Sequence, residues 1–279
     1  MHSSPYLSVI IPAYRQARTI CHELFVLKSY FDETFPSYEI ILVIDGNEDN
    51  TFEAVTSTVS FPELHVECFT HNQGKGAAVR HGLNLAQGKL IAFIDAGGEL
   101  QPADLKHMID EMEMQAADIV IGSKRHVSSQ VSYPKLRRAY SSVYQLLNRL
   151  LFKMEIRDTQ VGMKLFRREV LQAILPLLVV ERFAFDLELL VVAYNLGFNR
   201  IIEAPVTLQY QFSSSISWRS VYQMLWDTLL IFYRSRILHS YRQSSRLQPP
   251  IPTLSPILIR TKAPNIQTQK TQPPVRVRS

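Results

Sequence analysis

Short apolar runs recur through the first half of the chain, and segments with helical spacing separate them. The runs are rich in β-branched and aromatic residues, which favours buried strands. The pattern predicts strands at 7–13, 39–44, 65–70, 89–94 and 118–122, with helices over 77–86 and 102–114 among the segments between them. This alternation predicts an α/β fold, in which helices cover both faces of a mostly parallel sheet.

The loops that follow the strands are the expected place for a ligand. In open α/β sheets, ligands bind beyond the carboxyl ends of the strands. The loops in question are 14–18, 45–50, 71–76, 95–99 and 123–126, and most of them contain charged residues. We therefore expect one functional site along this edge of the sheet.

The second half of the chain has a different pattern. We expect amphipathic helices at 134–153 and 219–238, and between them a turn, RDTQVGMKLF, and an acidic helix that ends at Gly197. One side of the first amphipathic helix would contain Leu136, Tyr140, Val143, Leu147, Leu150 and Leu151. Basic residues flank both helices, as is typical of helices that lie in a bilayer interface. Packing in the core or against a second copy of the chain is the alternative.

Composition and charge define the organisation further. With 279 residues, 46% of them hydrophobic, the chain is long enough for one main domain. After Asp227 there are basic residues and no acids, which suits an anionic membrane surface better than nucleic acid. We expect a catalytic domain at 1–240, with a donor-binding half (1–126) and an acceptor half (127–240), and a disordered, basic, proline-rich tail at 241–279.

The spacing of the cysteines and the length of the apolar runs indicate the cellular compartment. Cys21 and Cys68 fit no metal-binding or redox spacing, so we expect reduced thiols in the core. No apolar run reaches the roughly 18 residues that a membrane-spanning helix needs. We expect a cytoplasmic protein that associates peripherally with the inner face of a membrane.

Two strand-end loops contain residues suited to a nucleotide. In HNQGKGAAVRHG, Lys75 lies between two glycines where a strand meets a helix, so amides, helix dipole and ammonium favour a phosphate. A merely solvated lysine is the alternative. Asp45 ends a strand in VIDGNEDNT and can accept hydrogen bonds from a nucleobase or ribose, or can cap the following helix.

A third loop, FIDAGGELQPADL, places Asp95 and Glu99 around a Gly-Gly turn. Carboxylates at such a flexible turn can meet around a hard cation, Mg²⁺ or Mn²⁺, that also contacts phosphate oxygens. In the alternative, Glu99 caps the helix that starts at Pro102, and Asp95 alone faces the ligand.

The motifs occur in an order that resembles a known family. The order SVIIPAY, VIDGNEDNT, NQGKGAAVRHGLNLAQG, FIDAGG and GSK resembles the nucleotide-sugar-binding half of inverting glycosyltransferases with the GT-A fold. RDTQVGMKLF and ERFAFDLELL resemble the polyprenyl-phosphate glycosyltransferases, and among them the dolichyl-phosphate glucosyltransferase type. The resemblance covers about 7–236. It implies a divalent metal, a nucleotide-sugar donor such as UDP-glucose, and a polyprenyl-phosphate acceptor at a membrane surface.

The resemblance also implies roles for particular residues. The donor would be bound by Pro12, Tyr14, Gln16, Asp45, Lys75 and Asp95, with the metal on Asp95 and Glu99. Lys124, Arg125, Arg137 and Arg138 would hold the acceptor phosphate, and Asp158 and Gln160 would shape the sugar pocket. Solvation of these cations and turn capping by Asp158 are the alternatives. The catalytic set would be Asp95, Asp186, Lys124 and Arg137.

Helix geometry limits the acidic helix to one catalytic carboxylate. Asp186 and Glu188 are two residues apart, so only one of them can face the site, and we favour Asp186. A phosphate acceptor needs no strong base, since its second pKa is about 6. For a saccharide or protein acceptor, Asp186 would act as the general base.

Two positions depart from the family's pattern. Gly97 stands where the second acid of a D-x-D pair is usual, and Arg15-Gln16 replaces Asn-Glu in the first loop. Both changes remove negative charge near the donor. A non-catalytic nucleotide-sugar-binding homologue therefore stays open as an alternative.

Overall fold

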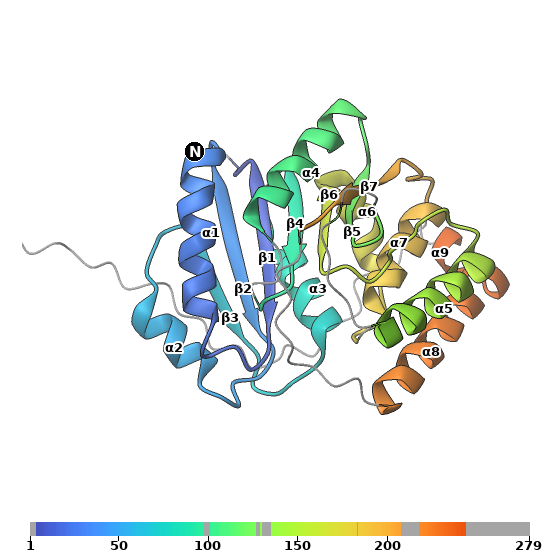
Figure 1. The fold of residues 1–279 in the computed structure, drawn as a ribbon, viewed down its shortest axis with the longest axis horizontal. Coiled ribbons are helices and arrows are strands. Elements are labelled where there is room, and N and C mark those ends of the chain that lie inside the picture. Colours follow the sequence, from blue (N-terminus) through green and yellow to red (C-terminus); the bar gives the residue numbers. More distant parts are fainter. Residues whose placement is uncertain are drawn as a thin grey trace, which may run out of the picture.

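A computed structural model describes residues 4–97, 101–126, 129, 135–182, 184–207 and 218–243. Its centre is a seven-stranded sheet of order β3-β2-β1-β4-β6-β5-β7 (Figure 1). The strands are β1 Leu7–Ala13, β2 Tyr38–Ile44, β3 Leu64–Cys68, β4 Leu90–Ile94, β5 Ile119–Ser123, β6 Met163–Arg167 and β7 Ile201–Pro205. The five predicted strands are present to within two residues at each end. The pattern missed β6 and β7.

The sheet is mostly parallel, as predicted. Strand β6 is the exception in the described chain, because it pairs antiparallel with both β4 and β5. The start of β6 therefore lies at the edge of the sheet where its neighbours end. This reversal decides what reaches the site, as described below.

Helices cover both faces of the sheet. They are α1 Ile20–Thr34, α2 Thr51–Thr58, α3 Lys75–Leu85, α4 Pro102–Met114, α5 Lys135–Phe152, α6 Arg168–Ile174, α7 Phe185–Asn195, α8 Trp218–Phe232 and α9 Ser240–Gln243. A 3₁₀ turn, Leu175–Leu177, follows α6, and a π-helical turn, Tyr233–Ile237, follows α8. Gly197 has a φ of +97° just beyond the end of α7, as predicted for a helix stop.

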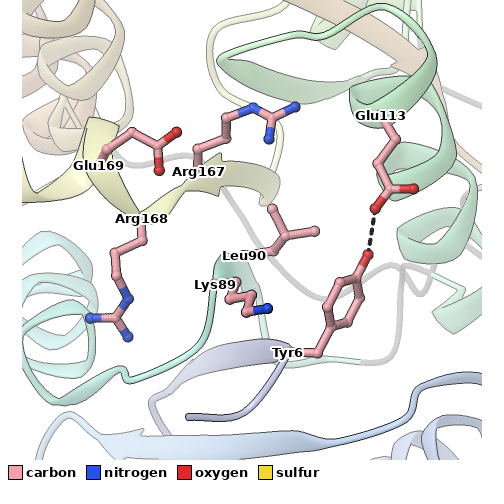
Figure 2. A pocket seen from close by; sticks show the side chains of 7 residues that line it. All are labelled: Tyr6, Lys89, Leu90, Glu113, Arg167, Arg168 and Glu169. Atoms are coloured by element: carbon pink, nitrogen blue, oxygen red, sulfur yellow. Dashed lines mark hydrogen bonds between the residues drawn. The ribbon is translucent and has the colours of Figure 1, made fainter.

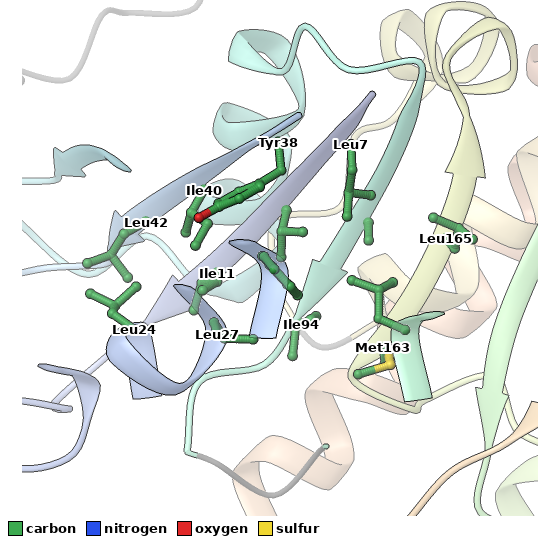
Figure 3. Close-up of a cluster of buried hydrophobic side chains, with 14 of the residues drawn as sticks. Leu7, Ile11, Leu24, Leu27, Tyr38, Ile40, Leu42, Ile94, Met163 and Leu165 are labelled. Carbon is green, nitrogen blue, oxygen red and sulfur yellow. The ribbon is translucent and has the colours of Figure 1, made fainter. Parts of the chain in front are cut away.

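Two hydrophobic layers hold these helices to the sheet. On one face, side chains of α1, α2 and α4 pack on Leu7, Ile11 and Leu42 of the strands. Figure 3 shows Leu24 and Leu27 of α1 against these strand residues. On the other face, α3, α6 and α7 pack on Ile10 and Phe93. Strand β2 is buried along its whole length, which explains why it reads as one continuous apolar run. Cys68 is buried, Cys21 is partly buried, and both are free thiols.

Polar groups lie on the inward side of helices α5 and α8, and much of the apolar surface of the two helices is exposed. Tyr144 Oη lies 2.9 Å from Thr228 Oγ1 between them, and Gln145 and Asn148 contact Thr159 in the core. Phe152 and Ile231 are buried in the core, whereas eight other described apolar side chains of the two helices are exposed. We call this surface the α5–α8 face: Val143, Leu146, Leu150, Tyr222, Leu225, Trp226, Leu229 and Leu230.

The core-packing alternative for α5 is therefore wrong at two of the residues assigned to its apolar side. Val143 and Leu150 are each 69% exposed. At these two positions the helix faces away from the core, where Gln145 and Asn148 make their hydrogen bonds. Leu151, assigned to the same side, is partly buried and packs against the core. In the described ranges, no helix is both long and apolar enough to cross a bilayer.

The folded chain extends into the segment predicted as a tail. Tyr241 of α9 is 2% exposed and donates a hydrogen bond of 2.8 Å to Glu188. Residues 244–279, the rest of the predicted tail, lie outside the described residues.

Candidate active site

Four charged side chains of alternating sign form a chain at the edge of the sheet where most strands end. Lys164 Nζ lies 2.5 Å from Asp186 Oδ1, and Lys75 Nζ lies 3.0 Å from Asp186 Oδ2. Lys75 Nζ is also 2.8 Å from Asp95 Oδ1. The residues come from β6, from the first turn of α7, from the start of α3 and from the end of β4. We call them the four-charge cluster.

Sequence reasoning found three of these four residues. Lys75, Asp95 and Asp186 were predicted site residues, and the structure brings them into contact. The alternative of a solvated Lys75 is wrong, since its ammonium has two carboxylate partners. Lys164 was missed, although it lies in the RDTQVGMKLF motif. The position of Lys164 between the apolar residues Met163 and Leu165 could have indicated a buried lysine with an acidic partner.

The pKa shifts agree with these contacts. Burial alone would raise the pKa of Asp186, but Lys164 and Lys75 outweigh it and hold the pKa below the usual value. For Lys75 burial acts to lower the pKa, and Asp186 and Asp95 raise it overall. For Lys164 burial dominates, and the net pKa is lowered despite Asp186. Asp186 is therefore a stabilised anion, and Lys75 a stabilised cation.

Glu188 has a purely structural environment. Its carboxylate accepts hydrogen bonds of 2.9 and 2.8 Å from the amides of Val179 and Val180, and it also accepts the bond from Tyr241. Of the two acids of α7, Asp186 contacts the predicted site residue Lys75, and the hydrogen bonds of Glu188 go to Val179, Val180 and Tyr241 instead. The role of Asp186 in the reaction stays a prediction.

Glycines let two segments pack closely against the cluster. A Cβ atom on Gly162 would lie 2.0 Å from Asp95 Oδ2, and one on Gly76 would lie 2.7 Å from Phe185 Cβ.

The amide of Ala77 donates to Glu181 O at 3.0 Å. One of the helix amides expected to hold phosphate is therefore occupied by a backbone carbonyl.

Asp45 organises the loop that contains Lys75. It is 3% exposed and accepts hydrogen bonds from the amides of Gln73, at 2.7 Å, and Gly74, at 2.9 Å. Asn72 Nδ2 donates to it at 3.0 Å. Burial raises its pKa, and the two amides oppose that rise. The helix-capping alternative is wrong, since the amides at the start of α2, those of Thr51 and Phe52, donate to Asp49 and Asn47 and not to Asp45.

The first loop lies against the second. Tyr14 Oη and Arg15 Nε each donate to Glu48 at 2.9 Å. The Gln16 side chain accepts a hydrogen bond of 2.8 Å from Thr19, and Pro12 is partly buried in β1. Contacts of Pro12, Tyr14 and Gln16 with a donor stay predictions.

The residues predicted for the acceptor form a second group. Asp158 is buried and accepts hydrogen bonds from the amides of Lys124, at 3.2 Å, and Gln160, at 3.4 Å. Burial raises its pKa, which Lys124 opposes. Arg125 donates to Ser142 of α5 at 3.1 Å. Asp158 thus makes the turn contacts of its capping alternative. The side chains of Arg137 and Arg138 lie outside the described residues.

The fit of a metal can be tested at Asp95. Its Oδ1 is buried and accepts no hydrogen bond from a described residue, although Lys75 is near as an ion pair. A hard carboxylate oxygen of this kind fits one ligand of Mg²⁺ or Mn²⁺. Over the described residues, no three His, Cys, Asp or Glu side chains cluster as a metal site. Glu99, the predicted second ligand, lies outside the described residues.

A pocket of about 380 Å³ lies at the opposite edge of the sheet (Figure 2). It lies beside the starts of β1 and β4, and Arg167 and Arg168 point their guanidinium groups to carbonyls of Ala117 and Gly88. These arginines support the ends of neighbouring elements. The pocket is lined by Tyr6, Lys89, Leu90, Glu113, Arg167, Arg168 and Glu169, and contains no predicted site residue.

Comparison with known proteins gives the family. Residues 8–175 match the model described as glycosyl transferase family 2. The chain belongs to this family. Among the relatives of this family 2 member, the dolichyl-phosphate β-glucosyltransferase of Dictyostelium discoideum is 34% identical over 69% of the chain and 63% of the relative. The dolichyl-phosphate β-glucosyltransferase ALG5A of Trichomonas vaginalis is 32% identical over 83% of the chain and 75% of the relative.

These relatives confirm the predicted resemblance to the dolichyl-phosphate glucosyltransferase branch of family 2. The chain spans slightly less than two thirds of the first of them, 63% of its length. Glucosyl-3-phosphoglycerate synthase from Mycobacterium tuberculosis, solved with Mn²⁺, UDP and phosphoglyceric acid, superposes with a TM-score of 0.62 at 16% identity, over 82% of the chain and 78% of that structure. The predicted GT-A fold is confirmed.

Proposed function

We propose that this family 2 member transfers glucose from UDP-glucose to a polyprenyl phosphate of the dolichyl type, with inversion at the anomeric carbon. The named relatives support the transferred sugar and the acceptor, because they are dolichyl-phosphate β-glucosyltransferases at 32–34% identity. The UDP bound in the M. tuberculosis synthase of similar fold supports the donor. Lys75, Asp95 and Asp186 come together at the edge of the sheet where such donors are expected.

The pairing of Asp186 favours a phosphate as the acceptor. Both of its oxygens contact an ammonium group, from Lys164 and from Lys75. A carboxylate stabilised in this way is a poor general base. An acceptor hydroxyl would need such a base, whereas a phosphate monoester already has an anionic oxygen near neutral pH. This observation carries the choice of a lipid phosphate over a saccharide or protein acceptor.

Different residues of the chain then bind the donor diphosphate, the acceptor phosphate and the sugar. Lys75 is the cation next to the expected diphosphate, and its charge offsets the charge that develops on the leaving group. Lys124, Arg125, Arg137 and Arg138 hold the acceptor phosphate, and Asp158 with Gln160 shapes the sugar pocket. Of these, Lys124 and Asp158 are already in contact, because the backbone amide of Lys124 donates a hydrogen bond to the Asp158 carboxylate.

A divalent cation, Mg²⁺ or Mn²⁺, on Asp95 and Glu99 belongs to the proposal. The M. tuberculosis synthase of similar fold was crystallised with Mn²⁺ and UDP, which supports this choice. When bound, such an ion supplies Lewis-acid stabilisation of the departing diphosphate.

The α5–α8 face supports an acceptor held in a membrane. Its exposed side chains include Trp226 and Tyr222, which suit the headgroup level of a bilayer. Arg149 of α5 and Lys153, which directly follows α5, are exposed. Apolar residues flanked by basic ones bind anionic interfaces. We propose peripheral association with the cytoplasmic leaflet, and pairing of this face with a second copy is the competing outcome.

The proposal is tested by incubating the purified chain with radiolabelled UDP-glucose, Mg²⁺ and dolichyl phosphate. Chloroform-soluble label is expected, and GDP-mannose serves as the control donor. If no common sugar nucleotide gives chloroform-soluble label, the proposal fails. UDP binding that is indifferent to Mg²⁺, with no transfer or hydrolysis, would instead support the non-catalytic homologue.

A further inference from the structure

The two oxygens of Asp95 share one ammonium partner. Lys75 Nζ lies 2.8 Å from Oδ1 and 3.0 Å from Oδ2 of this carboxylate. These are the oxygens that a divalent cation would bind in the proposed reaction. A cation of the protein itself therefore stands where the metal would be coordinated.

The backbone holds Lys75 at this position. Lys75 is the first residue of α3, and the loop before it is tied down by the hydrogen bonds of Asp45 to Gln73 and Gly74. The helix start is fixed on its other side, since Ala77 donates to Glu181 O. The ammonium can thus move only as far as its own side chain allows.

The second carboxylate of Lys75 is fixed as well. Asp186 is held by Lys164, whose ammonium also donates to Val161 O at 2.6 Å. Asp186 keeps the Lys75 ammonium next to Asp95 in the absence of a donor. It also remains a partner for Lys75 when the ammonium leaves Asp95.

A metal ion and this ammonium compete for the same charge. Mg²⁺ binds carboxylate oxygens at about 2.0–2.1 Å, so the two cations would approach to within a few ångströms of each other. Their repulsion is strong in a site partly shielded from water. A nucleotide diphosphate relieves it, because it brings negative charge to both cations and supplies further oxygen ligands to the metal.

We propose that Lys75 is a positioning residue that competes with the divalent cation for Asp95, so that the metal enters the site together with the donor diphosphate. The inference rests on the proposed function only in taking Asp95 as a metal ligand. It concerns the order of binding, and it predicts that nucleotide and metal each strengthen the binding of the other.

The test measures Mn²⁺ binding to the full chain by titration calorimetry and by the paramagnetic resonance signal of free Mn²⁺, with and without UDP. Lys75→Met removes the charge and keeps the length of the side chain. Without UDP, this variant should bind Mn²⁺ about tenfold or more tightly than the unchanged chain. With UDP, the difference should shrink. Lys75→Arg, which keeps the charge, should bind Mn²⁺ as weakly as the unchanged chain.

Two outcomes would overturn the inference. One is equal Mn²⁺ affinity of Lys75→Met and the unchanged chain in the absence of UDP. The other is a gain in affinity that persists when Asp95→Asn is added to Lys75→Met, since the gain must come through Asp95. Circular dichroism checks that each variant is folded. If glucosyl transfer is absent but the competition is measured, only the proposed function fails.

Discussion

Lys164 and Asp186 form an ion pair with almost no access to water. Their atoms Nζ and Oδ1 are 2.5 Å apart, and the side chains are 0% and 4% exposed. Strand β6 places the lysine against one oxygen of Asp186, and Lys75 contacts the other oxygen. The carboxylate is held from both sides, so its orientation is fixed before any substrate binds.

Removing Lys164 should destabilise the protein strongly. Lys164→Met leaves the buried Asp186 with one cation fewer, and loss of one partner of a buried pair costs about 3–5 kcal/mol. Urea unfolding followed by circular dichroism measures the change. The double variant Lys164→Met with Asp186→Asn should lose less than the two single losses added together. Additive losses would show that the pair is not coupled.

Gly162→Ala should impair the site more than the fold. The new methyl group would lie 2.0 Å from Asp95 Oδ2 and must displace that carboxylate. We expect glucosyl transfer to fall by about 100-fold or more, as for a misplaced catalytic group. The matched control is Gly197→Ala, where no atom lies within 4 Å of the methyl and only the positive φ is strained. Equal loss of transfer in both variants would contradict the role of Gly162.

Charges on the α5–α8 face should weaken membrane binding several-fold and leave stability unchanged. Leu150→Glu and Trp226→Glu place carboxylates on side chains that are 69% and 54% exposed. Co-sedimentation with vesicles of phosphatidylcholine and phosphatidylserine should fall several-fold, because apolar burial and attraction to the anionic lipid are both reduced. Phe25→Glu on α1, at a residue 46% exposed, is the control and should bind normally. A dimer in solution that both variants split would favour a second copy as the occupant.

The Glu188 carboxyl should make stability fall as the pH rises. Burial raises its pKa above the usual 4.5, and the amides of Val180 and Val179 only partly oppose this. The folded state therefore holds a proton that the unfolded state releases near that value, so folding is favoured less above it. Unfolding free energies at a series of pH values should show the wild type losing stability relative to Glu188→Gln from about pH 4.5 upward. A difference that is constant with pH would refute this assignment.

Asp186→Asn separates the classes of acceptor. With a phosphate acceptor, the change weakens the hold on Lys75 and should reduce kcat by about 10- to 100-fold, while the pH profile keeps its shape. With a hydroxyl acceptor, the lost general base should cost more, and the basic limb of the profile should disappear. The rate of transfer between pH 5.5 and 9, measured with the acceptor that the unchanged chain glucosylates, decides between them.

The first half of the fold could be predicted because its strands are continuous apolar runs with turn residues after them. Asp45, Lys75 and Asp95 follow such runs, so their convergence at one edge was predictable from strand direction. Strand β6 was not predicted, since MKLFR contains two charged residues that resemble a loop. Lys164 was missed together with this strand. In addition, its partner Asp186 is 22 residues away in the sequence. A contact over that separation depends on how α7 packs, which periodicity does not specify.

Because β6 runs in the opposite direction to its neighbours, the short segment at its start contacts both Asp95 and Asp186. Gly162 and Lys164 are two residues apart, so they face the same side of the strand, and one makes room for Asp95 while the other anchors Asp186. A slip of one residue in the pairing of this segment with β4 and β5 would turn both toward the opposite layer. The pairing register of β6 with β4 and β5 is therefore as important for the site as the carboxylates of Asp95 and Asp186.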